Sequence, residues 1–173
     1  MKKIALLAAV IGSFVFSGCE GPEGPRGATG YSAESTVLEL RNVNFTLNQN
    51  NEFTIYRQLG SGILLTDNIV IYRLSGTIDS QTPIWQPIPR TIYFDNSPNE
   101  FDYDYDFSRE DYTIYAGGNY DITTTPNLLN DETFRIVIIP GYFGNKSSNL
   151  DTMDYKTLIS TYKIDDSKVR VLN

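Results

Sequence analysis

Few side chains in this 173-residue sequence are of the types that perform covalent chemistry. Histidine is absent, and cysteine occurs once, at Cys19. The lack of histidine excludes Ser-His-Asp and Cys-His nucleophile systems and histidine-bound zinc sites. The chain has 21 Asp and Glu residues, so some pair of carboxylates must lie close by chance, and composition alone does not indicate a two-carboxylate glycosidase. We expect no enzyme activity, no metal site and no cofactor.

Cys19 stands at the end of a stretch with the layout of a secretory signal. Two lysines precede a largely apolar run over residues 4–16, and two small residues follow it. This run is shorter than the roughly 20 residues that span a bilayer. The segment Phe16–Cys19 resembles a bacterial lipobox, whose cysteine is acylated and becomes the first residue of the mature chain. We therefore predict a signal peptide over residues 1–18 and a lipid on Cys19 that holds the protein on a membrane.

A collagen-like pattern follows the cysteine. Glycine occupies every third position from Gly21 to Gly30, with Pro22 and Pro25 in the next slot of two triplets. In collagen only glycine fits at the axis where three polyproline-II chains meet. So few triplets do not offset the entropy of ordering three chains. We favour an extended stalk over residues 19–34, about 3.1 Å long per residue, and keep a trimer formed through this segment as the alternative.

Residues 35–173 have the size and aromatic content of one packed domain. The chain contains 12 Tyr and 9 Phe residues, and its formal net charge is −7. Removal of Lys2 and Lys3 with the signal peptide makes the mature chain still more acidic. This acidity argues against nucleic acid as a partner and against electrostatic docking on anionic lipid. The single cysteine also excludes an intramolecular disulfide, so the fold depends on its core.

Short apolar and aromatic runs between turn residues predict a mostly β fold. We expect a single antiparallel β-sandwich, immunoglobulin-like or similar, with about seven or eight strands. The expected strands lie at 37–47 (with a bulge near Asn42), 53–56, 68–74, 91–95, 101–107, 112–115, 134–139 and 169–172. The strand at 134–139 is almost wholly apolar, which predicts burial on both faces. We expect a loop at 76–82 and, because proline donates no ladder hydrogen bond, an edge or crossover segment at 83–89.

Aromatic and acidic residues alternate over the segment 101–107, which predicts a half-buried strand. We expect one face in the core (Phe101, Tyr103, Tyr105, Phe107) and the other in water (Asp102, Asp104, Asp106). A calcium site is the alternative for the aspartates, because hard cations prefer oxygen ligands. Residues on one face of a strand repeat only about every 6.6–6.8 Å, too far apart for one strand to chelate an ion. We favour a solvated acidic face.

One α-helix is expected near the C-terminus, over residues 149–162. Apolar residues recur there at helical spacing on a single face (Tyr155, Leu158, Ile159, Tyr162). Asp151 is the expected N-cap, because its carboxylate can accept hydrogen bonds from the first free N–H groups of the helix.

Taken together, these segments resemble lipoproteins of Bacteroidota that join a lipobox cysteine to a few collagen-like triplets and a small β-domain. The resemblance rests on Phe16–Cys19, the triplets, and the segments at 84–89, 101–107, 134–141 and 153–155. Such proteins generally lack an assigned activity. The resemblance implies an outer-membrane lipoprotein and leaves open whether the domain faces the periplasm or the cell surface.

Two functions remain in view. The leading hypothesis is a non-catalytic structural or assembly component of the outer membrane, anchored through the lipid on Cys19 and contacting an outer-membrane protein. The alternative is a module that binds a glycan or a surface protein through exposed aromatic side chains. Trp85 is the candidate ligand-binding residue, because an amphipathic ring in a proline-rich stretch suits such a surface. Packing of Trp85 beside an edge strand is the competing interpretation, and we favour it.

Overall fold

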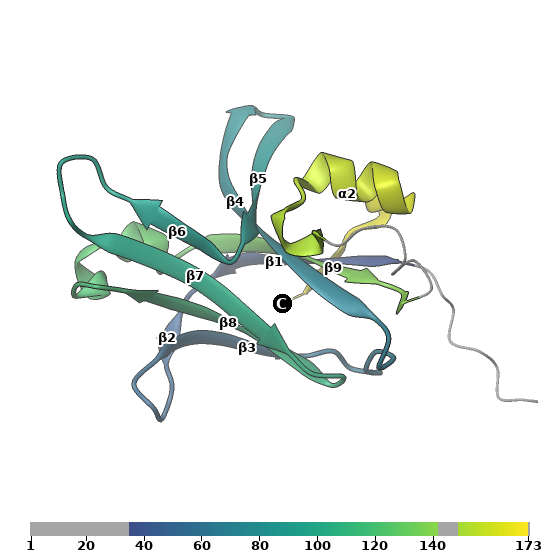
Figure 1. Ribbon diagram of the computed structural model, residues 1–173, viewed down its shortest axis with the longest axis horizontal. Coiled ribbons are helices and arrows are strands. Elements are labelled where there is room, and N and C mark those ends of the chain that lie inside the picture. The colour runs from purple at the N-terminus through teal and green to yellow at the C-terminus, as the bar shows by residue number, and fades with distance from the viewer. Residues whose placement is uncertain (1–34, 142–148, 173) are drawn as a thin grey trace, which may run out of the picture. The chain divides into compact units, whose positions relative to one another are not determined.

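Two five-stranded sheets make up most of the fold (Figure 1). The computed structural model describes residues 35–141 and 149–172. Sheet A has the strand order β10-β1-β9-β4-β5, and sheet B has the order β2-β3-β8-β7-β6. Neighbouring strands are antiparallel, except that β10 runs parallel to β1. The described residues belong to one unit, Ala33–Asn173.

The element bounds are as follows. Sheet A consists of β1 (Thr36–Val43), β4 (Asn68–Asp79), β5 (Thr82–Ile88), β9 (Glu132–Ile139) and β10 (Arg170–Leu172). Sheet B consists of β2 (Thr46–Leu47), β3 (Phe53–Gln58), β6 (Arg90–Tyr93), β7 (Glu100–Phe107) and β8 (Asp111–Gly118). The helical elements are α2 (Tyr155–Tyr162) and the short 3-10 turns η1 (Ile122–Thr124), η2 (Pro126–Leu128), η4 (Leu150–Thr152) and η5 (Asp166–Lys168). The predictions of a mostly β chain and of a single α-helix are confirmed for the described residues.

The described residues contain more strands than the predicted seven or eight, partly because one expected strand is divided. At the bulge expected near Asn42, the pairing of β1 with β9 changes register and Asn42 adopts a φ of 51°. The chain then leaves sheet A and enters sheet B as β2. The segment 83–89 also contributes: β5 forms an edge of sheet A, and the chain continues into β6 at an edge of sheet B. The prediction of an edge or crossover segment there is confirmed.

The facing sides of the two sheets form one hydrophobic core. Sheet A contributes Leu38, Leu40, Ile71, Phe134 and Ile136, and sheet B contributes Ile55, Phe101, Tyr103, Tyr112 and Ile114. Aromatic rings meet at the centre, with the Phe101 and Tyr103 centroids 4.9 Å apart. Edge-to-face and tilted contacts of this kind stabilise a core beyond the area that they bury.

Helix α2 covers the other face of sheet A. Tyr155, Leu158 and Tyr162 pack there against Val70 and Val137. Strand β9 is thus buried on both sides, as its continuous apolar run predicts. The arrangement has three layers: sheet B, sheet A and the helix (Figure 1). No helix within the described ranges has both the length and the apolar character to cross a bilayer.

The helix begins later than expected. Residues 150–152 form the 3-10 turn η4, and α2 starts at Tyr155. Its N-cap is Asp154, whose carboxylate accepts a hydrogen bond from the backbone N–H of Thr157. The prediction of Asp151 as N-cap is therefore wrong. Both aspartates precede the apolar face, and only the later one is followed by continuous helical turns.

Strand β7 confirms most of the predicted alternation. Phe101 and Tyr103 are 0% and 1% exposed, and Tyr105 is half-buried with its hydroxyl donating to the carbonyl of Ile69 at 2.9 Å. Phe107 departs from the prediction: it is 39% exposed, beside the β7–β8 turn, and stacks on Tyr105. On the opposite face Asp104 and Asp106 are exposed and Asp102 is half-buried, so the solvated acidic face is confirmed.

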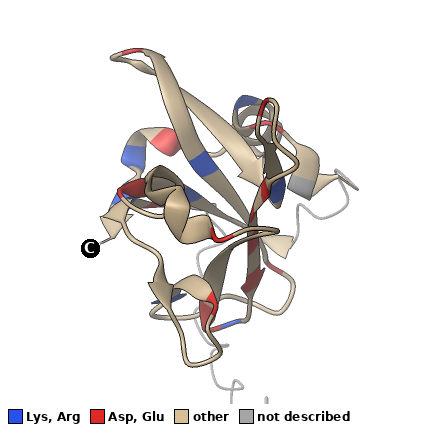
Figure 2. Cartoon of the chain, turned by 90° about the vertical axis from the view of Figure 1, so that its left-hand side faces the viewer, with Lys and Arg blue, Asp and Glu red and all other residues tan. Residues whose placement is uncertain are grey.

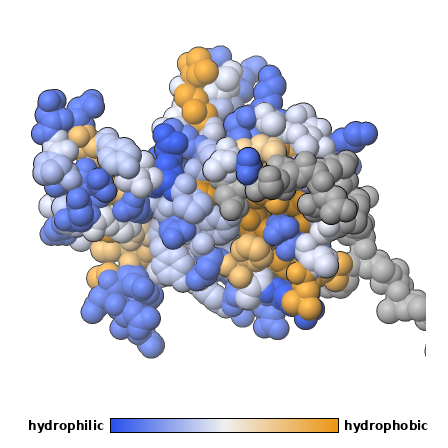
Figure 3. All heavy atoms as spheres, in the orientation of Figure 1, coloured by the Kyte–Doolittle hydropathy of each residue, from blue (hydrophilic) through white to orange (hydrophobic). Residues whose placement is uncertain are grey.

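A hairpin arm projects from sheet A (Figure 1). Strand β4 pairs with β9 only as far as Arg73, yet its pairing with β5 continues to Asp79. We call residues 75–84 the arm. The predicted loop at 76–82 is thus largely strand, because each half of the hairpin supplies the other's hydrogen bonds. Ile78 and Ile84 on the arm are 74% and 41% exposed, and Figure 3 shows apolar atoms at its tip.

Tyr112 gives a stability prediction. Its side chain is 0% exposed, and its hydroxyl has no hydrogen-bond partner among the described residues. Burial raises the pKa of Tyr112 to about 12. An unpaired buried hydroxyl costs free energy, so Tyr112→Phe should leave the free energy of unfolding unchanged or raise it by up to about 1 kcal/mol. Urea denaturation of the two proteins measures the difference.

Tyr103→Phe is the matched control. Tyr103 is equally buried, but its hydroxyl donates to the carbonyl of Leu128 at 2.7 Å. Its loss leaves that carbonyl without its partner and should destabilise the protein by about 1–3 kcal/mol. A greater loss from Tyr112→Phe than from Tyr103→Phe would show that the hydroxyl of Tyr112 is paired.

Candidate functional site

The two predicted site residues fall in different parts of the chain. Cys19 lies outside the described residues, so its lipidation stays a prediction. Trp85 lies on β5 and is half-buried at the margin of the apolar layer beneath α2. The guanidinium carbon of Arg135 lies 4.4 Å from the Trp85 ring centroid, and the Tyr155 ring lies 5.9 Å away.

Arg135, on β9, contacts Trp85 of β5, Glu39 of β1 and Tyr155 of α2. Its Nε donates to Oε2 of Glu39 and its Nη1 donates to the hydroxyl of Tyr155, both at 2.7 Å. Burial alone would raise the pKa of Glu39, but the hydrogen bonds from Arg135 and Arg41 outweigh it and hold that pKa below its ordinary value. Trp85 thus contributes packing between β5, β9 and α2, and the guanidinium covers its ring. A role of Trp85 in ligand binding remains a hypothesis.

A polar cleft opens where the arm leaves sheet A. We call it the arm cleft; its volume is about 510 Å³. Two stretches far apart in sequence line it: residues 73–93, from strands β4, β5 and β6, and residues 127–128, from the turn η2. The lining residues are Arg73, Ser75, Gln86, Arg90, Thr91, Ile92, Tyr93, Asn127 and Leu128. Neither Asp nor Glu is among these described residues.

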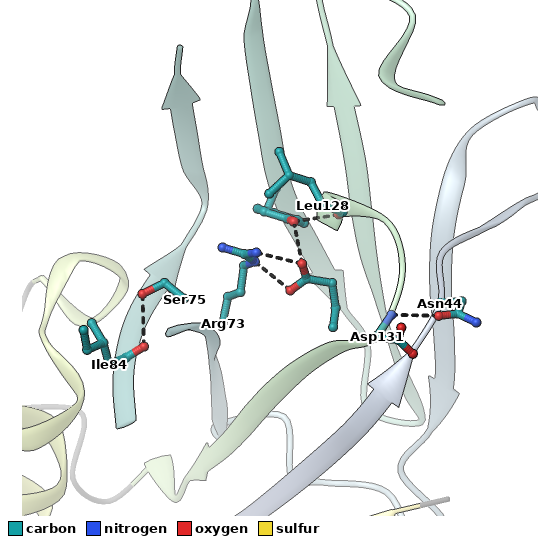
Figure 4. A network of polar contacts seen from close by, with 8 residues as sticks. Asn44, Arg73, Ser75, Ile84, Leu128 and Asp131 are labelled. Atoms are coloured by element: carbon teal, nitrogen blue, oxygen red, sulfur yellow. Dashed lines mark hydrogen bonds and ion pairs between the residues drawn. The ribbon is translucent and has the colours of Figure 1, made fainter. Parts of the chain in front are cut away.

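Arg73, which lines the arm cleft, forms a buried ion pair with Glu132 (Figure 4). Arg73 donates through Nε and Nη2 to the two carboxylate oxygens of Glu132, each at 2.7 Å. The side chains are 11% and 4% exposed, respectively. Burial lowers the pKa of Arg73, but the bonds to Glu132 outweigh this effect and raise it. Tyr103 lies beneath, with the guanidinium carbon 4.9 Å from its ring centroid.

This pairing orients the guanidinium of Arg73. A guanidinium carries five N–H donors in a rigid plane. Because Nε and Nη2 form the edge that binds Glu132, Nη1 points away from that carboxylate. Arg73 thus neutralises Glu132 and keeps further donors at the wall of the cleft.

A second groove crosses the outer face of sheet B and has a volume of about 570 Å³. We call it the sheet B groove. Its described lining is acidic and aromatic: Asn51, Glu52, Phe53, Asp102, Asp104, Tyr115, Ala116, Gly117, Gly118, Tyr120, Asp121 and Ile122. Gly117 leaves room in it, since a Cβ at this position would meet no atom within 4 Å. Within the described part of the chain, no three His, Cys, Asp or Glu residues come close enough together to hold a metal ion.

No local pattern in the sequence predicts the arm cleft. Arg73 lies inside an apolar segment and Arg90 follows Pro89, and neither position by itself indicates a site. Only the pairing of β4 with β5 and the placement of η2 bring these residues together, and no local pattern encodes either.

Comparison of this chain with protein-family models, curated proteins and solved structures finds no match.

Proposed function

We propose that this protein is an outer-membrane lipoprotein, anchored through Cys19, that acts as a non-catalytic structural or assembly component. The observation that carries the proposal is the order of segments: a lipobox-like Phe16–Cys19, then glycine triplets, then the β domain. Burial of acyl chain contributes about 0.8 kcal/mol per CH2, and two or more chains anchor a protein stably. The lipid would thus hold the domain on the membrane without any spanning helix.

The arm supports an assembly role. Its strands extend beyond β9, so both edges of the hairpin are free of further strands in the described fold. Ile78 and Ile84 expose apolar surface on it. An ordered projection with apolar side chains suits a contact with an outer-membrane protein, because the buried core of a protein interface is more apolar than the rest of the surface.

Replacing the anchor residue tests the lipid. Cys19→Ser removes the thiol that the lipid would modify, so we expect soluble or uncleaved protein instead of membrane-bound protein. The measurement is fractionation of cells fed an alkyne fatty acid, followed by detection of the label on the protein. Ser17→Ala is the matched control: it keeps a small residue beside the cleavage site and should stay labelled. Wild-type protein in the soluble fraction with a free thiol would contradict the proposal.

A second candidate function is the binding of a saccharide or a surface protein by the domain. Tyrosine side chains line both grooves, and this favours it: Tyr93 in the arm cleft is 72% exposed, and Tyr115 and Tyr120 in the sheet B groove are half-buried. Ligand sites typically combine such rings with a few polar groups in a concave surface. Binding of the purified protein to immobilised polysaccharides tests this function.

A further inference from the structure

We infer that the arm cleft binds an acidic saccharide, one whose sugar rings carry carboxylates. The inference rests on the second candidate function and specifies its site and its class of ligand. Four properties of the cleft support it: its net charge, its unused polar groups, its exposed ring and its size.

The cleft is positively charged on an acidic protein. The charge of Arg73 is offset by Glu132, which is buried next to it and binds it through two hydrogen bonds. Arg90 is exposed at the cleft and forms no ion pair within the described residues. Acidic and basic residues are interspersed over the domain (Figure 2), so the immediate lining decides the local charge. A free guanidinium in such a place binds a carboxylate through two parallel hydrogen bonds.

The neutral polar side chains of the cleft suit hydroxyl groups. The side-chain amides of Gln86 and Asn127 make no hydrogen bonds to other described residues. Each of these side chains offers two N–H donors and a carbonyl acceptor. Ser75 donates its hydroxyl proton to the carbonyl of Ile84 at 3.2 Å, as Figure 4 shows, so its oxygen can still accept. A saccharide hydroxyl can both donate and accept a hydrogen bond, so a ligand rich in hydroxyls can pair with all three side chains.

The ring of Tyr93 supplies an apolar platform. It is 72% exposed at the mouth of the cleft, where an aromatic face can pack against the C–H face of a pyranose. The volume of about 510 Å³ falls within the range of about 300–1,000 Å³ that is usual for small-molecule sites. The sheet B groove also has aromatic rings, but Asp102, Asp104 and Glu52 would repel an anionic ligand there.

Calorimetric titration of the purified full-length protein tests the inference. The probes are trimers of galacturonate and of glucuronate, with the neutral galactose trimer for comparison. We expect the wild type to bind at least one uronate trimer more tightly than the neutral one. Arg90→Gln should weaken uronate binding at least tenfold and change neutral binding little, whereas Tyr93→Ala should weaken both. Both side chains are exposed, so the fold should survive these changes.

Gly117→Val is the matched control in the sheet B groove. A strand position with free space accepts valine, and binding in the arm cleft should be unchanged. Loss of binding in Gly117→Val but not in Arg90→Gln would overturn the cleft assignment and leave saccharide binding intact. Binding of a triglutamate peptide as tight as that of the uronates would overturn the ligand class. A wild type that binds none of the trimers would contradict saccharide binding itself, while the lipid anchor would be unaffected.

Discussion

Replacing Arg73 by Met should lower the free energy of unfolding by about 3–5 kcal/mol, because it strands the carboxylate of Glu132 without a cation in a nearly dry site. Glu132 is 4% exposed, and both of its oxygens accept from Arg73. Urea denaturation monitored by far-UV circular dichroism measures the loss in free energy of unfolding. The comparison Arg41→Met removes a cation whose side chain is 58% exposed beside Glu39 and should cost less than about 1 kcal/mol.

The double variant Arg73→Met with Glu132→Met distinguishes the free energy of the ion pair from the cost of leaving Glu132 without a partner. Because both charges are then gone, the stranded carboxylate disappears and much of the stability should return. The two single variants and the double variant form a thermodynamic cycle. A double variant that is less stable than Arg73→Met alone would show that Glu132 is not stranded by loss of Arg73, and the account of the buried pair would fail.

Phe101→Ala should cost about 3–5 kcal/mol, the usual loss when a large buried ring is truncated. Phe101 is 0% exposed, and its centroid lies 4.9 Å from that of Tyr103 in the centre of the core. Asp104→Asn, on the opposite face of the same strand, should change stability by less than about 0.5 kcal/mol. Denaturant melts of both variants give the comparison.

Phe107, at the end of the same strand, provides a further control for the effect of burial. Phe107 is 39% exposed, so Phe107→Ala should cost much less than Phe101→Ala. A larger loss from Asp104→Asn than from Phe101→Ala, or a calcium-dependent melting temperature that Asp104→Asn abolishes, would mean that the acidic face is a metal site.

The sequence predicts best those strands that have a strong local pattern. Alternation over 101–107 identifies both faces of β7, and the continuous apolar run at 134–139 identifies a strand covered on both sides. The exception at Phe107 arises where the strand reaches its turn, because a periodic pattern does not show where the opposing layer ends.

The errors share a physical cause. The sequence places the start of α2 too early because Asp151 and Asp154 are equally good caps by residue type, and packing decides between them. The sequence predicts a loop in the arm because glycine and proline weaken the local strand signal, whereas pairing of β4 with β5 supplies hydrogen bonds that no local pattern contains. The arm cleft depends on contacts between distant segments, such as Arg73 with Glu132, so residue type and spacing could not indicate it.

The central claim is the lipid on Cys19, and mass spectrometry of the N-terminal tryptic peptide tests it most directly. The account predicts that protein from the membrane fraction yields the peptide 19–26, beginning at Cys19 and carrying diacylglycerol on its sulfur. Treatment with lipase should remove the acyl mass from this peptide alone. Recovery of the peptide 4–26 with a free thiol, or of a mature N-terminus at another residue, would contradict the account.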